Sequence, residues 1–203
     1  CAVKCADRVT TVSQTYMEEL TQEANGLEQL FVMEKAKSSG ILNGIDTVVW
    51  NPKTDTYILD NFSLKDAEAG KLLNKKKLCK DFNLDIKLPL FIYIGRLVGE
   101  KAADLLPQAI TDALSQLGNK MNFLILGSGD KRVEDQLSYL TGNFAGYYNS
   151  KIGYNEKLSH QMYAGADFIL MPSRVEPCGL NQMYALRYGT IPVVRSTGGL
   201  KDT

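Results

Sequence analysis

The stretch LPLFIYIGRLVGEKAADLLPQAITDALSQLGNKMNFLILGSG, residues 88–129, decides the fold. Two short apolar runs, 88–95 and 121–127, flank a segment with a different period. Pro107 lies at the start of that segment, where a helix loses little by its missing N–H. Further along, apolar residues recur at the spacing of a helix packed on a sheet: Leu106, Ile110, Leu114 and Leu117. The stretch therefore predicts a strand, a helix and a second strand.

The same alternation continues to residue 196. Asn155 can cap a helix over 155–167, and Gly189 can end another that begins near residue 179. Three further β-prone runs complete the pattern: 144–153, 167–174 and 190–196. Five strands alternating with helices predict an α/β fold, a Rossmann-like parallel sheet with helices on both faces. Ligands of such folds gather at the carboxyl ends of the strands.

The first part of the chain has a different pattern. Residues 1–45 are interpreted as the C-terminal end of a preceding Rossmann-like domain and the start of a linker, and 46–203 as a second Rossmann-like domain. A β-prone run ends at Ser13, which can cap the helical segment after it, and Ser63 is expected to open a charged helix whose run 74–77 faces solvent. Turns are expected in the linker at Asn43-Gly44 and Asn51-Pro52. The chain lacks an initiator Met and stops after a Gly-Gly turn, so we expect a piece of a longer protein.

Composition excludes several classes of partner. Lys plus Arg and Asp plus Glu each total 23, so no net charge attracts nucleic acid or an anionic membrane surface. The apolar runs are far shorter than the roughly 20 residues that cross a bilayer, and no signal peptide opens the chain. The four cysteines show neither zinc-site spacing nor the density of a disulfide scaffold. These features predict a cytoplasmic protein with reduced thiols, no metal and no cofactor.

Two groups of residues at strand ends could bind phosphate. Arg96 follows one strand and Lys101 comes five residues later, at the expected start of a helix, so both cations could converge on a diphosphate. The alternative is that they are two surface cations. Gly127 and Gly129 end the next strand and could let a ligand approach the backbone, or could simply form a tight turn. Arg132 stands where a dinucleotide fingerprint needs a further glycine, which argues against NAD.

A single carboxylate, Glu176, follows the fourth strand together with Arg174. The helix after it begins with free N–H groups that could bind phosphate. Glu176 could accept a hydrogen bond from a sugar hydroxyl while the amides and cations stabilise the charge that develops on a departing diphosphate. Alternatively, it could be only a carboxylate that is favoured at the start of a helix. Tyr154, at a strand end, could stack on a base or cover the core edge. His160, the single histidine, is interpreted as a packing or surface residue.

Four stretches closely resemble the bacterial glycogen synthases and plant starch synthases. They are GILNGIDTVVWNP (40–52), IGRLVGEKAADLL (94–106), IGYNEKLSHQMYAGADFILMPS (152–173) and EPCGLNQMYALRYGTIPVVRSTGGLKDT (176–203). The resemblance implies the glycosyltransferase B architecture, in which two Rossmann-like domains face each other across a cleft. It further implies transfer of glucose from ADP-glucose to the non-reducing end of an α-1,4-glucan, with retention of configuration.

The resemblance also implies roles for individual residues. By motif, Glu176 is the acid beside the donor sugar, Arg96 and Lys101 bind the diphosphate, and Tyr154 stacks on adenine. The loop and helix start that cradle sugar and phosphate correspond to Cys178, Gly179, Leu180 and Asn181. Position 184 holds Tyr rather than the second Glu of many related transferases, which is typical of the glycogen and starch synthases.

The chain departs from the family at two positions. Gln14 stands where the family often has Pro, and Ala102 where it usually has Gly. Ala102 would matter only if its φ were positive, and we expect it not to be, because its neighbours are helical. Alternatives to the family's reaction are another retaining transferase, of the sucrose- or trehalose-forming type, and a nucleotide-binding module without turnover. The acceptor site and Gly-rich donor loop of the family lie outside this chain, so we expect the chain alone to bind nucleotide weakly and to transfer nothing.

Overall fold

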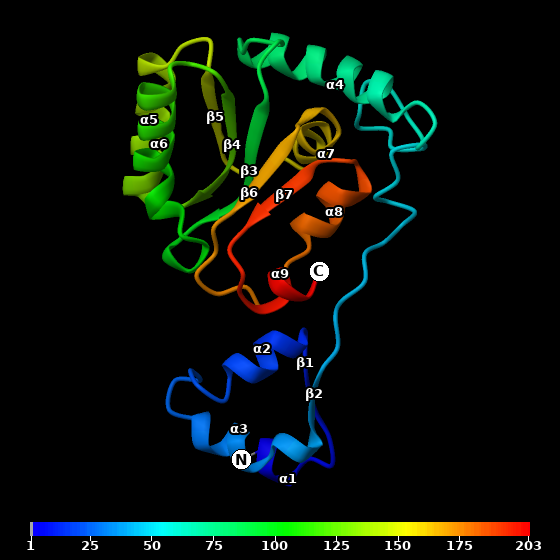
Figure 1. The fold of residues 1–203 in the computed structure, drawn as a ribbon, viewed down its shortest axis with the longest axis vertical. Coiled ribbons are helices and arrows are strands. Elements are labelled where there is room, and N and C mark those ends of the chain that lie inside the picture. Colours follow the sequence, from blue (N-terminus) through cyan, green and yellow to red (C-terminus); the bar gives the residue numbers. More distant parts are fainter. Residues whose placement is uncertain (1) are drawn as a thin grey trace.

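The computed structural model describes residues 2–203 and shows two lobes joined by an extended segment (Figure 1). The smaller lobe holds residues 2–40, and its two short strands pair in parallel. Its elements are α1 (Ala2–Cys5), β1 (Val9–Thr11), α2 (Gln14–Glu19), α3 (Glu28–Met33), a 3-10 turn (Lys35–Lys37) and β2 (Ser38–Gly40). The strand and helix expected on either side of Ser13 are thus present, and the Ser13 hydroxyl accepts a hydrogen bond from the Tyr16 N–H at the start of α2.

The larger lobe holds a five-stranded sheet in the order β5-β4-β3-β6-β7, with every pairing parallel. This arrangement confirms the predicted Rossmann-like sheet. Its elements are α4 (Ala67–Phe82), β3 (Leu90–Leu97), 3-10 turns at Gly99–Lys101 and Ala103–Leu105, α5 (Leu106–Leu117), β4 (Asn122–Gly129), α6 (Lys131–Asn143), β5 (Tyr148–Ile152), α7 (Glu156–Gly165), β6 (Phe168–Met171), α8 (Asn181–Arg187), β7 (Ile191–Val194) and α9 (Gly198–Asp202).

Helices cover both faces of the sheet, as predicted. Figure 1 shows α5 and α6 on one face and α4, α7 and α8 on the other. Side chains of β3 alternate between the two cores: Leu90 and Ile92 pack in the core of α4, α7 and α8, while Tyr93 packs in the core of α5 and α6. Because each fully buried Leu or Ile contributes about 1.5–3 kcal/mol, this two-sided burial holds the sheet together.

Local signals at the helix ends have the expected structural roles. The Asn155 side chain accepts from the Leu158 N–H at 2.8 Å and caps α7. Pro107 lies in the first turn of α5. Gly189 follows α8 with φ +71°, the left-handed conformation that favours glycine after a helix end. These contacts fix where the helices begin and end relative to the strands.

Three expectations for residues 40–82 were wrong in part. The helix expected to open at Ser63 begins at Ala67, because Asp66 Oδ1 accepts from both the N–H and the hydroxyl of Ser63 and closes a turn there. In the run 74–77, only Lys76 and Lys77 are exposed. Asn74 is buried, with its amide bonded to the carbonyl oxygens of Gly70 and Asp60. Of the two turns expected in the linker, the one at 51–54 forms, while residues 43–44 form no turn.

The expectation for Ala102 was wrong as well. Its φ is +52° and its ψ +32°, so its backbone is left-handed although the residue is not glycine. The 3-10 turn ends at Lys101, and Ala102 redirects the chain into a second 3-10 turn before α5 begins at Leu106. Lys101 therefore lies five residues before the first residue of α5 rather than at its start.

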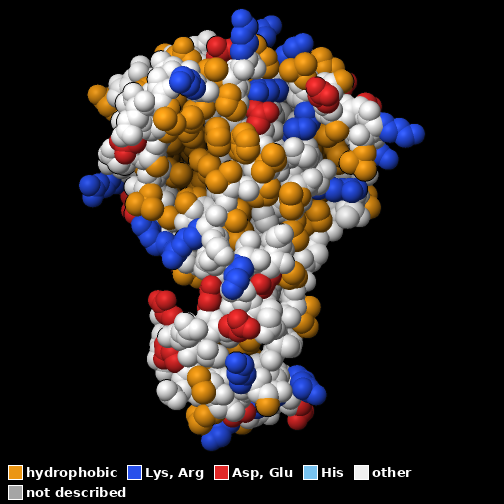
Figure 2. Space-filling view, in the orientation of Figure 1, with side chains coloured by type: hydrophobic (Ala, Val, Ile, Leu, Met, Phe, Trp, Pro, Cys, Tyr) orange, Lys and Arg blue, Asp and Glu red, His pale blue; other side chains and the backbone are white. Residues whose placement is uncertain are grey.

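Hydrophobic side chains gather over the face of the larger lobe that Figure 2 shows, where β6 and β7 lie in Figure 1. In β7, the exposed side chains include Ile191, Val193 and Val194. Among residues 2–203, no helix is both long and apolar enough to cross a membrane.

Two substitutions at Ala102 test the left-handed conformation. Ala102→Gly removes the conformational strain and loses one buried methyl, so we expect the free energy of unfolding to change by less than about 1 kcal/mol. Ala102→Val puts a β-branched side chain into a fully buried left-handed position and should lower it by about 3 kcal/mol. Urea unfolding followed by circular dichroism measures both. Equal stability of the two variants would contradict the assigned backbone.

Candidate functional site

Two hollows adjoin at the carboxyl ends of β3 and β6. The first has a volume of ≈ 340 Å³ and the second ≈ 210 Å³. Ile94, Gly95 and Asn181 line both, so the two form one continuous depression. This is the sheet edge where the fold predicts a ligand site. A larger hollow of ≈ 800 Å³ lies between residues 51–67 and the end of α8, away from the strand ends.

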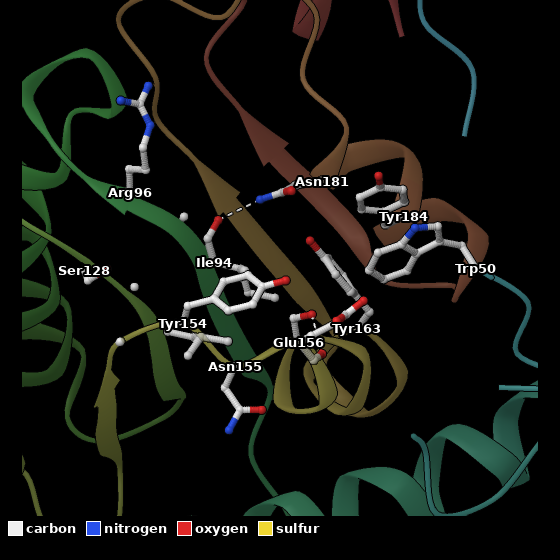
Figure 3. A pocket seen from close by; sticks show the side chains of 15 residues that line it. Trp50, Ile94, Arg96, Ser128, Tyr154, Asn155, Glu156, Tyr163, Asn181 and Tyr184 are labelled. Atoms are coloured by element: carbon white, nitrogen blue, oxygen red, sulfur yellow. Dashed lines mark hydrogen bonds between the residues drawn. The ribbon is translucent and has the colours of Figure 1, made fainter. Parts of the chain in front are cut away.

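The first hollow has aromatic walls. Tyr154, in the loop after β5, is 87% exposed and lies across the opening from Trp50 and Tyr184 in Figure 3. The Trp50 indole stacks on the Tyr184 ring with centroids 3.8 Å apart, and Tyr163 forms more of the wall. Flat aromatic faces suit a flat ring such as a nucleobase. Trp50 comes from the segment between the lobes, so that segment forms part of the hollow.

Buried polar residues support Trp50 from behind. His160 stacks on the other face of the indole at 3.9 Å, and its Nδ1 lies 2.7 Å from Asp55 Oδ2. The Tyr188 hydroxyl donates to the same oxygen, and the Tyr57 N–H donates to Oδ1. His160 is therefore a packing residue, as expected. Burial by itself raises the pKa of the Asp55 carboxyl, but the bonds from these three partners hold it below its usual range.

The second hollow contains a carboxylate and an ammonium group in contact. Glu176 is only 7% exposed, and its Oε2 lies 2.6 Å from Lys101 Nζ. The Ser173 hydroxyl donates to the same oxygen at 3.0 Å. Tyr93 also lines this hollow, and burial together with the nearby Glu176 carboxylate raises its pKa, so its phenol stays neutral. The pair supplies a fixed negative charge beside a cation that can bind an anion.

The backbone of Glu176 rests on two glycines of α9. Gly199 N–H donates to the Glu176 carbonyl oxygen at 2.9 Å. A Cβ on Gly198 would lie 2.0 Å from that oxygen, and one on Gly199 would lie 2.1 Å from the Cys178 carbonyl oxygen. Only glycine lets the two segments approach so closely. The Gly-Gly pair near the end of the chain therefore shapes the acid loop, a role that reasoning from the sequence missed.

The two predicted phosphate-binding cations do not converge. Lys101 contacts Glu176, whereas the exposed Arg96 guanidinium pairs with Glu100 at 3.3 Å and points away from the aromatic walls in Figure 3. Arg174 follows the same strand as Glu176. Its two terminal guanidinium nitrogens donate to the two carboxylate oxygens of Asp104 at 2.6 and 2.8 Å and so stabilise the turn over residues 99–104. Of the three cations, only Lys101 lines the second hollow, and Arg96 lines the first.

Of the other predicted residues, some line the hollows and others only pack within the fold. Gly127 lines the first hollow, while Gly179, Leu180 and Asn181 line the second, with the Asn181 amide donating to the Ile94 carbonyl oxygen at 2.7 Å. Close packing of β3 against β4 requires glycine at position 129, because a Cβ there would lie 2.4 Å from the Leu97 carbonyl oxygen. The Cys178 side chain is buried.

Two residues of the site were not singled out from the sequence. Trp50 had no local signal beyond being an aromatic residue in a linker, although it lies inside one of the resembling stretches. Ser173 could have been noticed, because it precedes Glu176 by three residues at the end of the same strand. Within residues 2–203, no group of three or more His, Cys, Asp or Glu side chains is placed to hold a metal ion.

A parallel sheet with an acid and a nucleobase-sized hollow at its carboxyl edge fits nucleotide-sugar chemistry. A model of the family described as "Glycosyl transferases group 1" matches residues 74–203. The chain belongs to the group 1 glycosyl transferases. The match begins in α4 and contains the whole sheet, including Glu176 and Lys101, so the site lies within the region that defines this family.

Individual glycosyl transferases are also similar. A glycogen synthase of Flavobacterium johnsoniae is 59% identical over 99% of this chain, which covers 42% of that protein. Soluble starch synthase 1 of Solanum tuberosum is 43% identical over the whole chain, which covers 32% of it. The solved catalytic domain of starch synthase IV from Arabidopsis thaliana, bound to ADP and acarbose, superposes over 99% of this chain with a TM-score of 0.88 and 38% identity. The match covers 42% of that structure, so the chain spans less than half the length of these relatives.

Removing the negative charge of Asp55 tests whether its hydrogen bonds with His160 and Tyr188 stabilise the packing around Trp50. Asp55→Asn leaves a buried histidine without its ionised partner and should lower the free energy of unfolding by about 3 kcal/mol near pH 7. Because the pKa of Asp55 is lower in the folded than in the unfolded glycosyl transferase, its contribution is present above pH 3.8 and is lost as the pH falls through the folded pKa.

Urea unfolding between about pH 5 and 2.5 measures this difference. The gap between wild type and Asp55→Asn should narrow as the pH falls. Asp135→Asn, which alters an exposed ion pair of this glycosyl transferase, is the control and should cost less than about 1 kcal/mol. A gap that stays constant over the range would show that Asp55 is not held ionised.

Proposed function

We propose that this chain is the donor-nucleotide-binding part of a glycogen or starch synthase. Such an enzyme transfers glucose from ADP-glucose to the non-reducing end of an α-1,4-glucan with retention, and we expect it to act in the bacterial cytoplasm. One observation carries the proposal: an aromatic hollow opens into a second hollow that holds Glu176 and Lys101. The relatives named glycogen synthase and starch synthase, and the ADP in the starch synthase structure, support it.

The hollows suggest where each part of the donor binds. Adenine would stack on Tyr154 in the first hollow, whose other wall is Trp50 and Tyr184. The diphosphate would lie near Gly95, with Lys101 on one side and Arg96 on the other. Arg96 can swing in at little cost, because an exposed ion pair such as that with Glu100 contributes only about 0–1 kcal/mol. Glucose would occupy the second hollow.

The second hollow also suggests how the bond is broken. Lys101 and Ser173 position the Glu176 side chain in the hollow, where its carboxylate would stabilise positive charge that develops on the sugar. Gly179, Leu180 and Asn181 line this hollow, and their backbone N–H groups would stabilise the charge that the departing diphosphate gains. We favour same-face attack: the bond from C1 to the diphosphate oxygen breaks, the glucan hydroxyl bonds to C1 from that side, and its proton passes to the leaving phosphate.

The chain by itself is proposed to be a nucleotide-binding module. Residues 1–45 would end the first Rossmann-like domain of the enzyme, and 46–203 would form most of the second. Because the chain spans less than half of its relatives, we expect it to bind nucleotide weakly and to transfer no glucose alone. A sucrose- or trehalose-forming transferase is the alternative for the longer protein, and competition between ADP-glucose and UDP-glucose would separate the two.

Nucleotide titration of this chain tests the binding site. Trp50 is the sole tryptophan of the sequence and lines the first hollow, so bound ADP should change its fluorescence. Loss of base stacking in Tyr154→Ala should weaken ADP binding by about tenfold. Tyr139→Ala, which removes a tyrosine that is 72% exposed on α6, is the matched control. Saturable ADP binding with no response to NAD is expected, and equal affinity of the two variants would remove Tyr154 from the site.

Glu176→Gln in the full-length enzyme tests the chemistry. The amide keeps the shape of the side chain but not its negative charge, so kcat should fall by about 10²–10³-fold. The affinity for ADP should stay within about threefold, because adenine and diphosphate contact other residues. Initial rates of glucose incorporation into glycogen, with ADP affinity from calorimetry, measure both. Turnover near the wild-type rate would rule out an electrostatic role for Glu176.

A further inference from the structure

Helix α2 of the smaller lobe holds the loop that carries Glu176. The Ser13 hydroxyl, at the start of α2, donates to the Pro177 carbonyl oxygen at 2.6 Å, across a sequence separation of 164 residues. Ser13 is fully buried, and its hydroxyl also accepts a hydrogen bond from the Tyr16 N–H. The hydroxyl is therefore held both as a donor and as an acceptor. The residue directly after the acid is therefore tied to the other lobe.

A second contact reaches the same loop through α9. Glu19, at the end of α2, accepts from the Gly198 N–H at 2.8 Å and from the Thr197 hydroxyl at 3.0 Å. Gly198 and Gly199 are the two residues on which the Glu176 backbone rests. Glu19 thus fixes the surface beneath the acid loop, while Ser13 fixes the loop itself.

A third contact holds the far end of α9. The Asp202 carboxylate accepts from both the N–H and the hydroxyl of Thr15, at 2.8 and 2.6 Å. Burial alone raises the pKa of Asp202, but the bonds from Thr15 hold it below its usual range, so the carboxylate stays ionised. With Glu19 at one end and Asp202 at the other, α9 cannot shift along α2 without breaking charged hydrogen bonds.

We infer that Ser13 and Glu19 are positioning residues for the reaction of the Glu176 site. Residues 172–180 contain no helix or strand, so their own backbone does not hold the acid in place. The Glu176 side chain contacts Lys101 and Ser173 of the larger lobe, and the N–H groups of Arg174 and Val175 donate to the Glu100 carbonyl oxygen. The carbonyl oxygens of Glu176 and Pro177 are held by α9 and α2. The contacts from α2 add to these, so the position of the acid depends in part on how the smaller lobe is docked.

The labelling rate of Cys178 tests this without any assay of the proposed function. Cys178 lies in the acid loop and is 5% exposed, and Cys79, 2% exposed in α4, is an internal control remote from α2. Each is labelled with a thiol reagent in this chain, and the sites are read by peptide mass spectrometry. In Ser13→Ala and Glu19→Ala, the rate at Cys178 should rise at least tenfold over wild type, with Cys79 unchanged.

Two further variants separate positioning from general loosening. Glu18→Ala removes the adjacent carboxylate, which is exposed on the same helix, and should leave both rates at wild-type values. Glu19→Gln keeps an oxygen that accepts the two bonds and should hold the Cys178 rate within about threefold of wild type. An unchanged Cys178 rate in Ser13→Ala and Glu19→Ala would overturn the inference, and so would an equal rise at Cys79.

A kinetic measurement in the full-length enzyme adds the functional consequence, which rests on the proposed transferase activity. Ser13→Ala and Glu19→Ala should lower kcat by about tenfold while ADP affinity, measured by calorimetry, stays within twofold. Wild-type kcat in both variants, or an equal loss of kcat and affinity, would overturn the positioning role. A wild-type enzyme that transfers no glucose would refute the proposed function instead, and the labelling rates would still decide the inference.

Discussion

Parallel pairing of β3 with both β4 and β6 is the constraint on which the site depends. It brings the carboxyl ends of three strands to one edge, so the loops after them meet although they are far apart in the sequence. Lys101 follows β3 and Glu176 follows β6, and their charged atoms lie 2.6 Å apart. Packed helices on both faces keep the strands in register, so this edge is rigid where the loops leave it.

The contact between Glu176 and Lys101 explains how a buried carboxylate is tolerated in the second hollow. A carboxylate with little access to water is costly unless a cation and further hydrogen bonds satisfy it, and Lys101 with Ser173 does so here. Lys101 therefore both neutralises the buried carboxylate and lines the second hollow. Removing either partner leaves the other charge buried and unpaired.

The hollows are completed by residues from outside the sheet. Trp50, from the segment between the lobes, is held between Tyr184 and His160 and forms a wall of the first hollow. Ser13 and Glu19, from the smaller lobe, hold the acid loop of the second. Both the aromatic wall and the acid therefore depend on how the smaller lobe and the connecting segment lie against the sheet.

The sequence by itself determined the five strands, the helices between them, the caps at Ser13 and Asn155, and the acid at the end of the fourth strand. Each rests on short-range periodicity or on a residue's own conformational preference. Only the tertiary structure decided that Lys101 contacts Glu176, that Ala102 is left-handed, and that Trp50 lines the hollow. These depend on contacts between residues far apart in the chain, whose geometry is set by strand order and lobe docking, and no local pattern encodes either.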